Sequence, residues 1–394
     1  MTDKPQFVGK KVKLGELCEI CSGGTPKRSV AEYWKDGTIP WVKIGDMSEK
    51  YVSSTEERIT DAGFNNSSVK MLESGTLLYS IFASIGAVSI LKIPATTNQA
   101  IAGLKIKDDS LDRDFLYHYL KSRESISKSS GRGAAQNNIN LTILRNMQVT
   151  LPSIEIQRSI VRNLEMISNQ VTIAESHLMD LDALVKSRFV DMFGDPIINP
   201  KNWQTKRLES MGELKNGVNF KSVDNGYEVK CLSVRDFKDK YSIDDMSQIG
   251  TVSLNGRPNA SQMLKNGDIV FVRSNGNKAL VGRCLAVFPK DEKLTFSGFC
   301  IRFRIESNDI NLDYFLNCMK SDSMRKAMIG RGANIQNLSQ AILSKLSIPI
   351  PPLSLQQEFV DFARQVNKSR FVAQQQIEKL QMLYDSLAQE YFGD

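Results

Sequence analysis

Two segments of the chain, 153–196 and 353–394, carry apolar residues at alternating intervals of three and four positions. This heptad pattern is typical of α-helices that pack against another helix. Proline precedes each segment at Pro152 and Pro351, and Gly194 and Gly393 fall near their ends, as expected at helix starts and stops. The predicted contact positions are Ile160, Leu164, Ile167, Val171, Leu178, Leu181 and Val185 in the first helix, and Phe359, Val366, Ile377, Leu380 and Tyr384 in the second, with Arg370 as a charged exception.

These two helices predict an antiparallel coiled coil inside one chain. Each would have roughly 40 residues and span ~60 Å at ~1.5 Å per residue. If the chain has internal pseudo-twofold symmetry, the helices run antiparallel and hold the rest of the chain apart as two domains. The alternative is that each helix only covers its own domain. Sustained heptad spacing favours helix-to-helix contact.

The two larger segments, 1–152 and 197–352, have the pattern of mixed α+β domains. Short apolar runs lie between Gly, Ser and Asn turns, and each segment has one stretch of helical spacing near its end. The expected strands are 38–44, 76–82, 86–93, 268–274, 281–288 and 298–305, and the expected helices are 112–125 and 312–321. The sequence thus predicts two mixed α+β domains, each followed by a long helix.

An internal repeat relates the two halves. Shifting the sequence by 199 positions places "GRGAAQNN" (131–138) on "GRGANIQN" (330–337), and Gln157 on Gln356. Nearer the start of each half the offset falls to 192, where "MLESG" (71–75) matches "MLKNG" (263–267). A repeat of this length is a domain rather than a solenoid unit.

Charge is divided along this repeat. The net charge is +4 over residues 1–152 and +8 over 197–352, but −3 over 153–196 and −2 over 353–394. A polyanion would therefore meet the large segments, and proteins would meet the helices. The remaining alternative is chance variation on solvated surfaces.

The six cysteines are scattered, which suits reduced thiols in a cytosol. Cys18 and Cys21 have the spacing of a zinc or redox pair, but no second pair or histidine follows at ligand spacing, so we expect no metal. The chain has no apolar run of 18 residues and no export signal, which predicts a cytoplasmic protein without membrane contact.

Several longer phrases resemble one family, the specificity subunits of type I restriction-modification systems. They are "GGTPKRSVAEYWKDGTIPWVKIGDM" (23–47), "TTNQAI" (96–101), the "GRGAAQNNIN" loop, "LPSIEIQRSIV" (151–161) and "FGDPIINPKNW" (193–203). The resemblance covers the whole chain, although "GVNFKSVDNGYEVKCLSVRDF" (217–237) lacks the "TP" and "IPW" landmarks. This divergence of the second half is what the resemblance would imply for a second domain that reads a different DNA sequence.

The resemblance implies a non-catalytic DNA reader from a bacterial or archaeal cell. It would bind double-stranded DNA, two modification (methyltransferase) subunits and, in the full complex, two restriction (motor-endonuclease) subunits. S-adenosylmethionine, ATP and Mg²⁺ would be bound by these partners, and this chain would hold no cofactor. The residues agree, because the chain lacks a phosphate-binding G-x-x-x-x-G-K-[ST] loop and an Asn/Asp-Pro-Pro-aromatic methyltransferase motif.

The repeated Gly-Arg-Gly-Ala loop is a candidate DNA contact, because its glycines permit close backbone approach and its arginines offer guanidinium groups. The alternative is a hinge between domain and helix. Polar residues at strand ends are the other candidates for DNA contact. The full set is Thr25, Lys27, Arg28, Lys43, Ser80, Ser84, Asn98, Gln99, Arg132, Gln136 and Asn138 in the first half, and Lys221, Arg235, Arg273, Ser274, Asn275, Asn277, Arg331, Gln336 and Asn337 in the second.

The rival function is a tandem-repeat scaffold that binds only proteins and does not read DNA. Sequence composition alone leaves this alternative open. A stand-alone methyltransferase or nuclease is disfavoured by the missing motifs.

Overall fold

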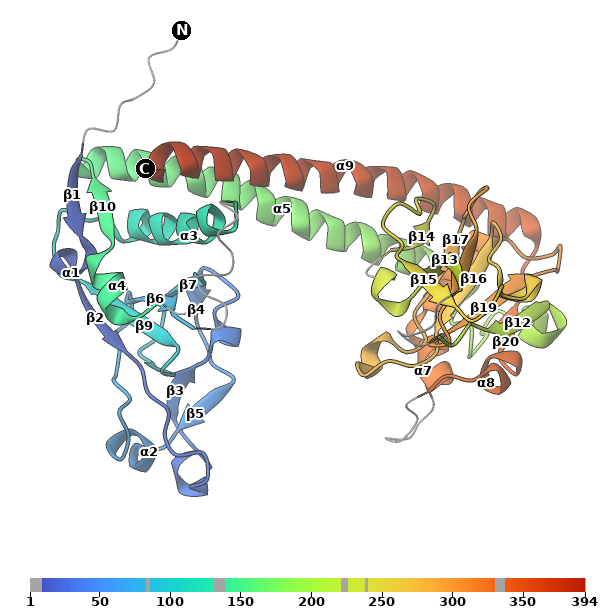
Figure 1. The fold of residues 1–394 in the computed structure, drawn as a ribbon, viewed down its shortest axis with the longest axis horizontal. Coiled ribbons are helices and arrows are strands. Elements are labelled where there is room, and N and C mark those ends of the chain that lie inside the picture. The colour runs from blue at the N-terminus through green and yellow to red at the C-terminus, as the bar shows by residue number, and fades with distance from the viewer. Residues whose placement is uncertain are drawn as a thin grey trace, which may run out of the picture. The chain divides into compact units, whose positions relative to one another are not determined.

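A computed structural model of the chain describes residues 9–82, 86–129, 139–220, 226–237, 240–329 and 337–393. Backbone contacts divide it into two compact units. The first unit combines residues 1–176 with 373–394, and the second comprises residues 177–372. Each unit therefore takes in part of both long helices, which are drawn in green and red in Figure 1.

The first unit has three small sheets. A five-stranded mixed sheet has the order β2-β9-β6-β7-β4, a three-stranded sheet the order β5-β3-β8, and β1 pairs with β10. The strands are β1 (Lys10–Lys13), β2 (Cys18–Ser22), β3 (Ile39–Val42), β4 (Tyr51–Val52), β5 (Glu57–Ile59), β6 (Leu77–Ser80), β7 (Val88–Leu91), β8 (Thr96–Thr97), β9 (Ile101–Ile106) and β10 (Gln148–Leu151). The helices are α1 (Leu14–Leu17), α2 (Asp61–Asn65), α3 (Arg113–Ser129), α4 (Leu141–Asn146) and the start of α5 (Ile154–Phe193).

The second unit repeats this topology strand for strand. Its sheets have the orders β12-β19-β16-β17-β14, β15-β13-β18 and β11-β20. The strands are β11 (Thr205–Arg207), β12 (Gly212–Asn216), β13 (Tyr227–Leu232), β14 (Ser242–Ile243), β15 (Thr251–Leu254), β16 (Asp268–Val272), β17 (Cys284–Val287), β18 (Leu294–Phe296), β19 (Cys300–Ile305) and β20 (Ser347–Pro349). The helices are α6 (Leu312–Lys320), α7 (Asp322–Ile329), α8 (Gln340–Ser344) and the start of α9 (Leu353–Phe392); the end of α5 also belongs to this unit, and the end of α9 to the first. The internal repeat predicted from sequence is confirmed.

The long helices pack against each other in antiparallel fashion, as predicted. In the first unit the side-chain amide of Asn163 donates to the Tyr391 hydroxyl at 3.1 Å, so the start of α5 lies beside the end of α9. In the second unit Arg188 pairs with Glu358 at 3.1 Å, so the end of α5 lies beside the start of α9.

The predicted contact positions of these helices all face inward. Arg370, the charged exception in the seam, pairs with Asp182 of α5 at 3.0 Å, so its charge is compensated. Ile160, Leu164, Ile167, Leu181, Phe359, Val366 and Tyr384 are buried, and Val171, Leu178, Val185, Ile377 and Leu380 are half-buried.

A buried glutamine joins each long helix to its domain. The Gln157 side chain donates to Ser110 O at 2.7 Å and Pro152 O at 2.9 Å, and accepts from Asp112 N at 2.8 Å. Its side chain is fully buried. Two of these hydrogen bonds, to Ser110 and Asp112, fix the first turn of α5 against the segment that leads into α3, and the third is local to the start of α5.

The second unit has the same glutamine contact. Gln356 donates to Asp309 O at 3.0 Å and Pro351 O at 2.8 Å, and accepts from Asn311 N at 2.8 Å. The match between Gln157 and Gln356 in the sequence repeat therefore reflects one structural role used twice.

Candidate nucleic-acid interface

Backbone hydrogen bonds define equivalent positions in the two units. Arg273 N donates to Phe299 O at 2.8 Å, and Ile81 N donates to Ala100 O at 2.8 Å. The residue two positions before the short helix α4 or α8 contacts the same position in each unit: Ile139 N donates to the Ile81 carbonyl at 3.1 Å, and Leu338 N donates to the Arg273 carbonyl at 2.8 Å. Arg273 thus corresponds to Ile81, and Phe299 to Ala100. Sequence comparison alone missed these equivalences because loops of different length separate them.

A second pair of equivalent positions lies in the short 3-10 turns η2 (Ile44–Asp46) and η4 (Val234–Asp236). The backbone N–H groups of Lys43 and Ser233 each donate to the aspartate carboxylate that ends the turn, at 2.7 Å in both units. Gly45 and Arg235 therefore occupy the same position. The two units share one backbone arrangement and differ in the side chains that it presents.

In the second unit, several predicted contacts gather at one site. Arg235, Ser274 and Asn275 line the same hollow, of about 630 Å³. Asn337, at the end of the repeated loop, pairs with Ser274 through a β-bridge. The Arg235 side chain is 74% exposed, and its Nε lies 3.8 Å from a carboxylate oxygen of Asp236, so the guanidinium is accessible from solvent although it is paired on one side.

The loop from Arg273 to Lys278 owes its shape partly to its own asparagines. The Asn275 side-chain oxygen accepts from Asn277 N at 2.8 Å, and the Asn277 oxygen accepts from Ala279 N at 3.0 Å. A bidentate contact to adenine uses both the oxygen and the nitrogen of the amide. The hydrogen bond within the loop uses one lone pair of each amide oxygen, so a contact with adenine would have to use the other lone pair and the NH2 group.

In the first unit, two predicted cations are already paired. Lys43 contacts both Glu56 and Glu57 at 2.7 Å, which raises the pKa of its ammonium group. Arg28 pairs with Glu57 and lies over the Trp34 ring, with its guanidinium carbon 3.8 Å from the ring centre. A phosphate would have to compete with these carboxylates for either cation.

The remaining candidates of the first unit differ in exposure. Lys27 and Gln99 are exposed at the surface. The Thr25 hydroxyl donates a hydrogen bond to the side-chain oxygen of Gln99. Asn98 is half-buried and its side chain accepts from Ala100 N at 3.0 Å. Ser80 was expected at the surface but is fully buried, where its hydroxyl accepts from Ala87 N at 2.9 Å, so it shapes the turn after β6. Ser84, Arg132, Gln136, Asn138, Lys221, Arg331 and Gln336 lie outside the described residues.

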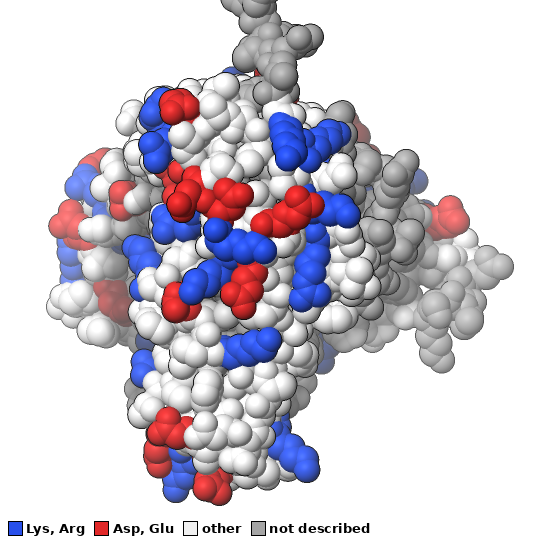
Figure 2. Space-filling view, turned by 90° about the vertical axis from the view of Figure 1, so that its left-hand side faces the viewer, with Lys and Arg blue, Asp and Glu red and all other residues white. Residues whose placement is uncertain are grey.

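Surface charge on the first unit is mixed on the face shown in Figure 2. Lys and Arg side chains are interspersed with Asp and Glu side chains there. The modest net charge of +4 over residues 1–152 is consistent with this picture. Contacts by individual side chains, rather than a broad basic field, would have to direct DNA to this face.

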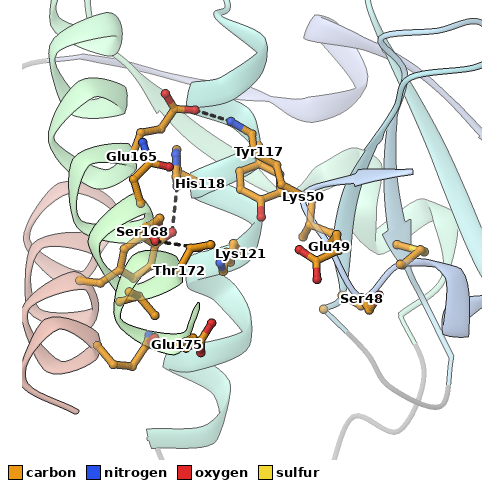
Figure 3. Close-up of a pocket in the computed structure, with 18 residues that line it drawn as sticks. Ser48, Glu49, Lys50, Tyr117, His118, Lys121, Glu165, Ser168, Thr172 and Glu175 are labelled. Carbon is orange, nitrogen blue, oxygen red and sulfur yellow. Dashed lines mark hydrogen bonds and ion pairs between the residues drawn. The ribbon is translucent and has the colours of Figure 1, made fainter. Parts of the chain in front are cut away.

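A polar pocket of about 490 Å³ also lies in the first unit, between β-loops and helices α3, α5 and α9. Figure 3 shows that Lys50, which lies just before β4, forms an ion pair with Glu165 of α5. Lys50 also pairs with Asp114 of α3 at 2.7 Å. His118 is buried, with its Nδ1 2.8 Å from the Tyr384 hydroxyl. Burial, reinforced by nearby lysine charges, lowers the pKa of His118 to about 3, so the imidazole is neutral.

The two cysteines with the CxxC spacing lie in or beside the core of the first unit, where Cys18 is buried and Cys21 is half-buried. Burial raises the pKa of the Cys18 thiol to about 12, which disfavours the thiolate that zinc requires. Among the residues that the structure describes, no group of three His, Cys, Asp or Glu side chains could hold a metal ion. Within the same residues, no helix has the length and apolar character needed to cross a membrane.

The long helices carry a second apolar set that the heptad reading did not identify. These side chains lie off the seam and are exposed, and Met179 reaches 67% exposure. In the first unit they are Met166, Ile173, Met382 and Leu383, and in the second Met179, Leu184, Val190, Phe371 and Val372. Exposed apolar sets of this kind are typical of protein-binding surfaces.

Comparison with known proteins identifies the family to which this duplicated arrangement belongs. The family model described as "Type I restriction modification DNA specificity domain" matches twice, over residues 9–180 and 200–382. The chain belongs to the type I restriction-modification DNA specificity family. Membership identifies it as a DNA-target recognition subunit of such a system.

Full-length relatives agree with this assignment. The MjaIX specificity subunit of Methanocaldococcus jannaschii is 24% identical over 401 residues, which covers 95% of this chain and 90% of the relative. The StySPI specificity subunit of Salmonella potsdam is 23% identical and covers 95% and 86%. A solved structure titled for complex assembly and conformational transition of the type I R-M system shares the fold, with a TM-score of 0.60, 17% identity and 98% coverage of both chains.

Proposed function

We propose that each unit of this specificity subunit reads one half of a bipartite DNA target, and that the two halves differ in sequence. The observation that carries the proposal is the shared backbone arrangement with different side chains at equivalent positions. Ile81, Ala100 and Gly45 in the first unit stand where the second unit has Arg273, Phe299 and Arg235. Base readout depends on such side chains, whereas phosphate contacts carry little sequence information.

The long helices are proposed to set the spacing of the half-sites and to dock two modification subunits. The exposed apolar set on α5 and α9 supports docking, because side chains such as Met179 and Phe371 leave most of their apolar surface in contact with solvent in the free chain. Two restriction subunits would complete the assembly in the cytoplasm of a bacterial or archaeal cell. Adenine methylation, DNA cleavage and the binding of S-adenosylmethionine, ATP and Mg²⁺ would belong to these partners.

The half-by-half reading is tested by exchanging residues 197–352 for the equivalent segment of a relative. Methylome sequencing of cells that carry the hybrid and its modification subunit should show one altered half of the target and one unchanged half. If both halves changed together, the units would not read independently.

The DNA-binding role itself is tested by the salt dependence of affinity. A complex of one specificity subunit with two modification subunits should bind its target tightly, with affinity that falls steeply as salt rises, because phosphate contacts release counterions. The isolated chain should bind DNA weakly. If mass measurement showed a stable monomer, and this monomer bound DNA with full affinity, the proposed assembly would be contradicted. If DNA affinity did not change with salt concentration, a protein-binding scaffold would be favoured.

A further inference from the structure

An apolar hollow opens on the second unit between η4 and the turn before β19. Two aromatic rings line it, Phe299 with 62% of its surface exposed and Phe220 with 40% exposed. Cys231 and Val252 add apolar wall, and Arg235 stands among the lining residues as a charged member. Among the described residues that line the hollow, none is acidic. The surface combines an apolar floor with a cationic rim.

The turn that presents Phe299 is held rigidly. Gly298 N donates to Val218 O at 2.7 Å, Cys300 N donates to Ser297 O at 2.8 Å, and the Phe299 carbonyl accepts from Arg273 N at 2.8 Å. The ring is therefore exposed on a backbone that cannot easily turn it inward.

The side chain of Asn219 lies close to the backbone of this turn at Gly298. A Cβ atom at Gly298 would lie 2.0 Å from the side-chain oxygen of Asn219, which is a clash. The Arg273 guanidinium contacts the carbonyl of the same glycine at 3.4 Å. A large apolar side chain exposed on a fixed turn points to a ligand that covers it.

The first unit lacks this surface although it shares the backbone. Its residue at the Phe299 position is Ala100, and its residue at the Arg235 position is Gly45. The aromatic ring and the guanidinium are therefore features of the second unit rather than of the shared architecture. A side chain that differs between two readers at one position is placed to distinguish their targets.

The chemistry of the hollow fits one feature of the DNA major groove. Thymine alone among the four bases carries a methyl group there, and phenylalanine makes apolar contact with it. Arginine beside it can donate to acceptors on a neighbouring base or to phosphate. A protein segment would also cover apolar surface, but the cationic rim without acidic lining favours a polyanion.

We propose that Phe299, together with Phe220, receives the 5-methyl group of a thymine in the half-site that the second unit reads. The proposal rests on the DNA-reading function above and names a base contact for it. Phe299 would act as a specificity-determining residue, and Ala100 would leave the first unit without this contact.

The test uses the complex with modification subunits and duplexes that carry the target found by methylome sequencing. Each thymine of the second half-site is replaced in turn by deoxyuridine, which removes only the methyl group. At one position we expect binding to weaken about fourfold, which corresponds to ~0.8 kcal/mol for one buried methyl group. Phe299→Ala should bind the thymine and deoxyuridine duplexes equally, and Phe299→Leu should keep the preference for thymine.

Thymines of the first half-site provide the internal control, because their replacement should have the same effect on wild type and on Phe299→Ala. The proposal is overturned if no deoxyuridine position distinguishes wild type from Phe299→Ala, or if the second half-site contains no T·A pair. Loss of modification subunits from Phe299→Ala would instead identify the hollow as a protein contact. If the wild-type complex binds no duplex at all, the proposed function fails rather than this contact alone.

Discussion

The paired glutamines at the starts of the long helices permit a test with a built-in control. Gln356→Met keeps the length of the side chain but removes its three hydrogen bonds to Asp309, Asn311 and Pro351. A typical hydrogen bond contributes ~0.5–1.5 kcal/mol net, and a buried group left unpaired costs more. We therefore expect a loss of about 2–4 kcal/mol from the contact between α9 and the segment before α6.

The assay is hydrogen–deuterium exchange at the backbone amide of Asn311, which donates its hydrogen bond to the side-chain oxygen of Gln356. Each ~1.4 kcal/mol corresponds to a factor of ten, so its exchange should accelerate at least tenfold in Gln356→Met. Gln157→Met is the matched control, since it should accelerate exchange at Asp112 and leave Asn311 protected. Unchanged protection of both amides would show that the glutamines do not fix the helices.

Three further outcomes are expected. Duplicating Ala174–His177 adds ~6 Å of helix. Since DNA rises ~3.4 Å per base pair, methylome sequencing should show that the spacer between the two half-sites lengthens by about one to two base pairs while the half-sites stay unchanged. An unchanged spacer would show that the helices do not set its length. Because burial lowers the pKa of His118 in the folded state, only the unfolded state takes up a proton at this residue as pH falls from 6.5 toward 3. His118 should therefore lower the unfolding free energy by about 1.4 kcal/mol per pH unit in this range. Urea titrations of His118→Gln should show a smaller pH dependence, and a pH dependence equal to that of wild type would contradict this role of His118. Replacing Met179 and Phe371 with serine should leave the thermal midpoint nearly unchanged but weaken co-purification with modification subunits, and full assembly of this variant would argue against docking on the exposed set.

Sequence patterning predicted the long helices and the repeat because both depend on local or periodic signals. The heptad spacing of residues such as Leu164 and Phe359 persists through whole helices, and these residues are buried as expected. The strand order was not predictable in the same way, because β2 pairs with β9 across more than 70 residues, and register depends on contacts that no local window contains.

The candidate site was predicted less completely, for a physical reason. A lysine or serine at a strand end is polar whether it faces solvent or completes a turn, so Ser80 and Lys43 could not be separated from surface contacts. Phe299 was missed because an apolar residue beside a strand predicts burial. The signal that could have found it is the contrast with Ala100, which becomes visible once backbone hydrogen bonds align the two units.

The discontinuous make-up of the first unit has a consequence for the order of events during synthesis. Phe115 of α3 packs against Phe392, with ring centres 5.3 Å apart, and Tyr119 packs against the same ring at 5.8 Å. The ribosome makes the strands of the first unit first, yet the core of that unit is completed only when Phe392 of α9 has been made. The second unit, made entirely of residues 177–372, is complete before that point. The domain translated first is thus the one finished last, and a nascent chain stalled before Ala373 would display a DNA-reading domain with its apolar core still open to chaperones.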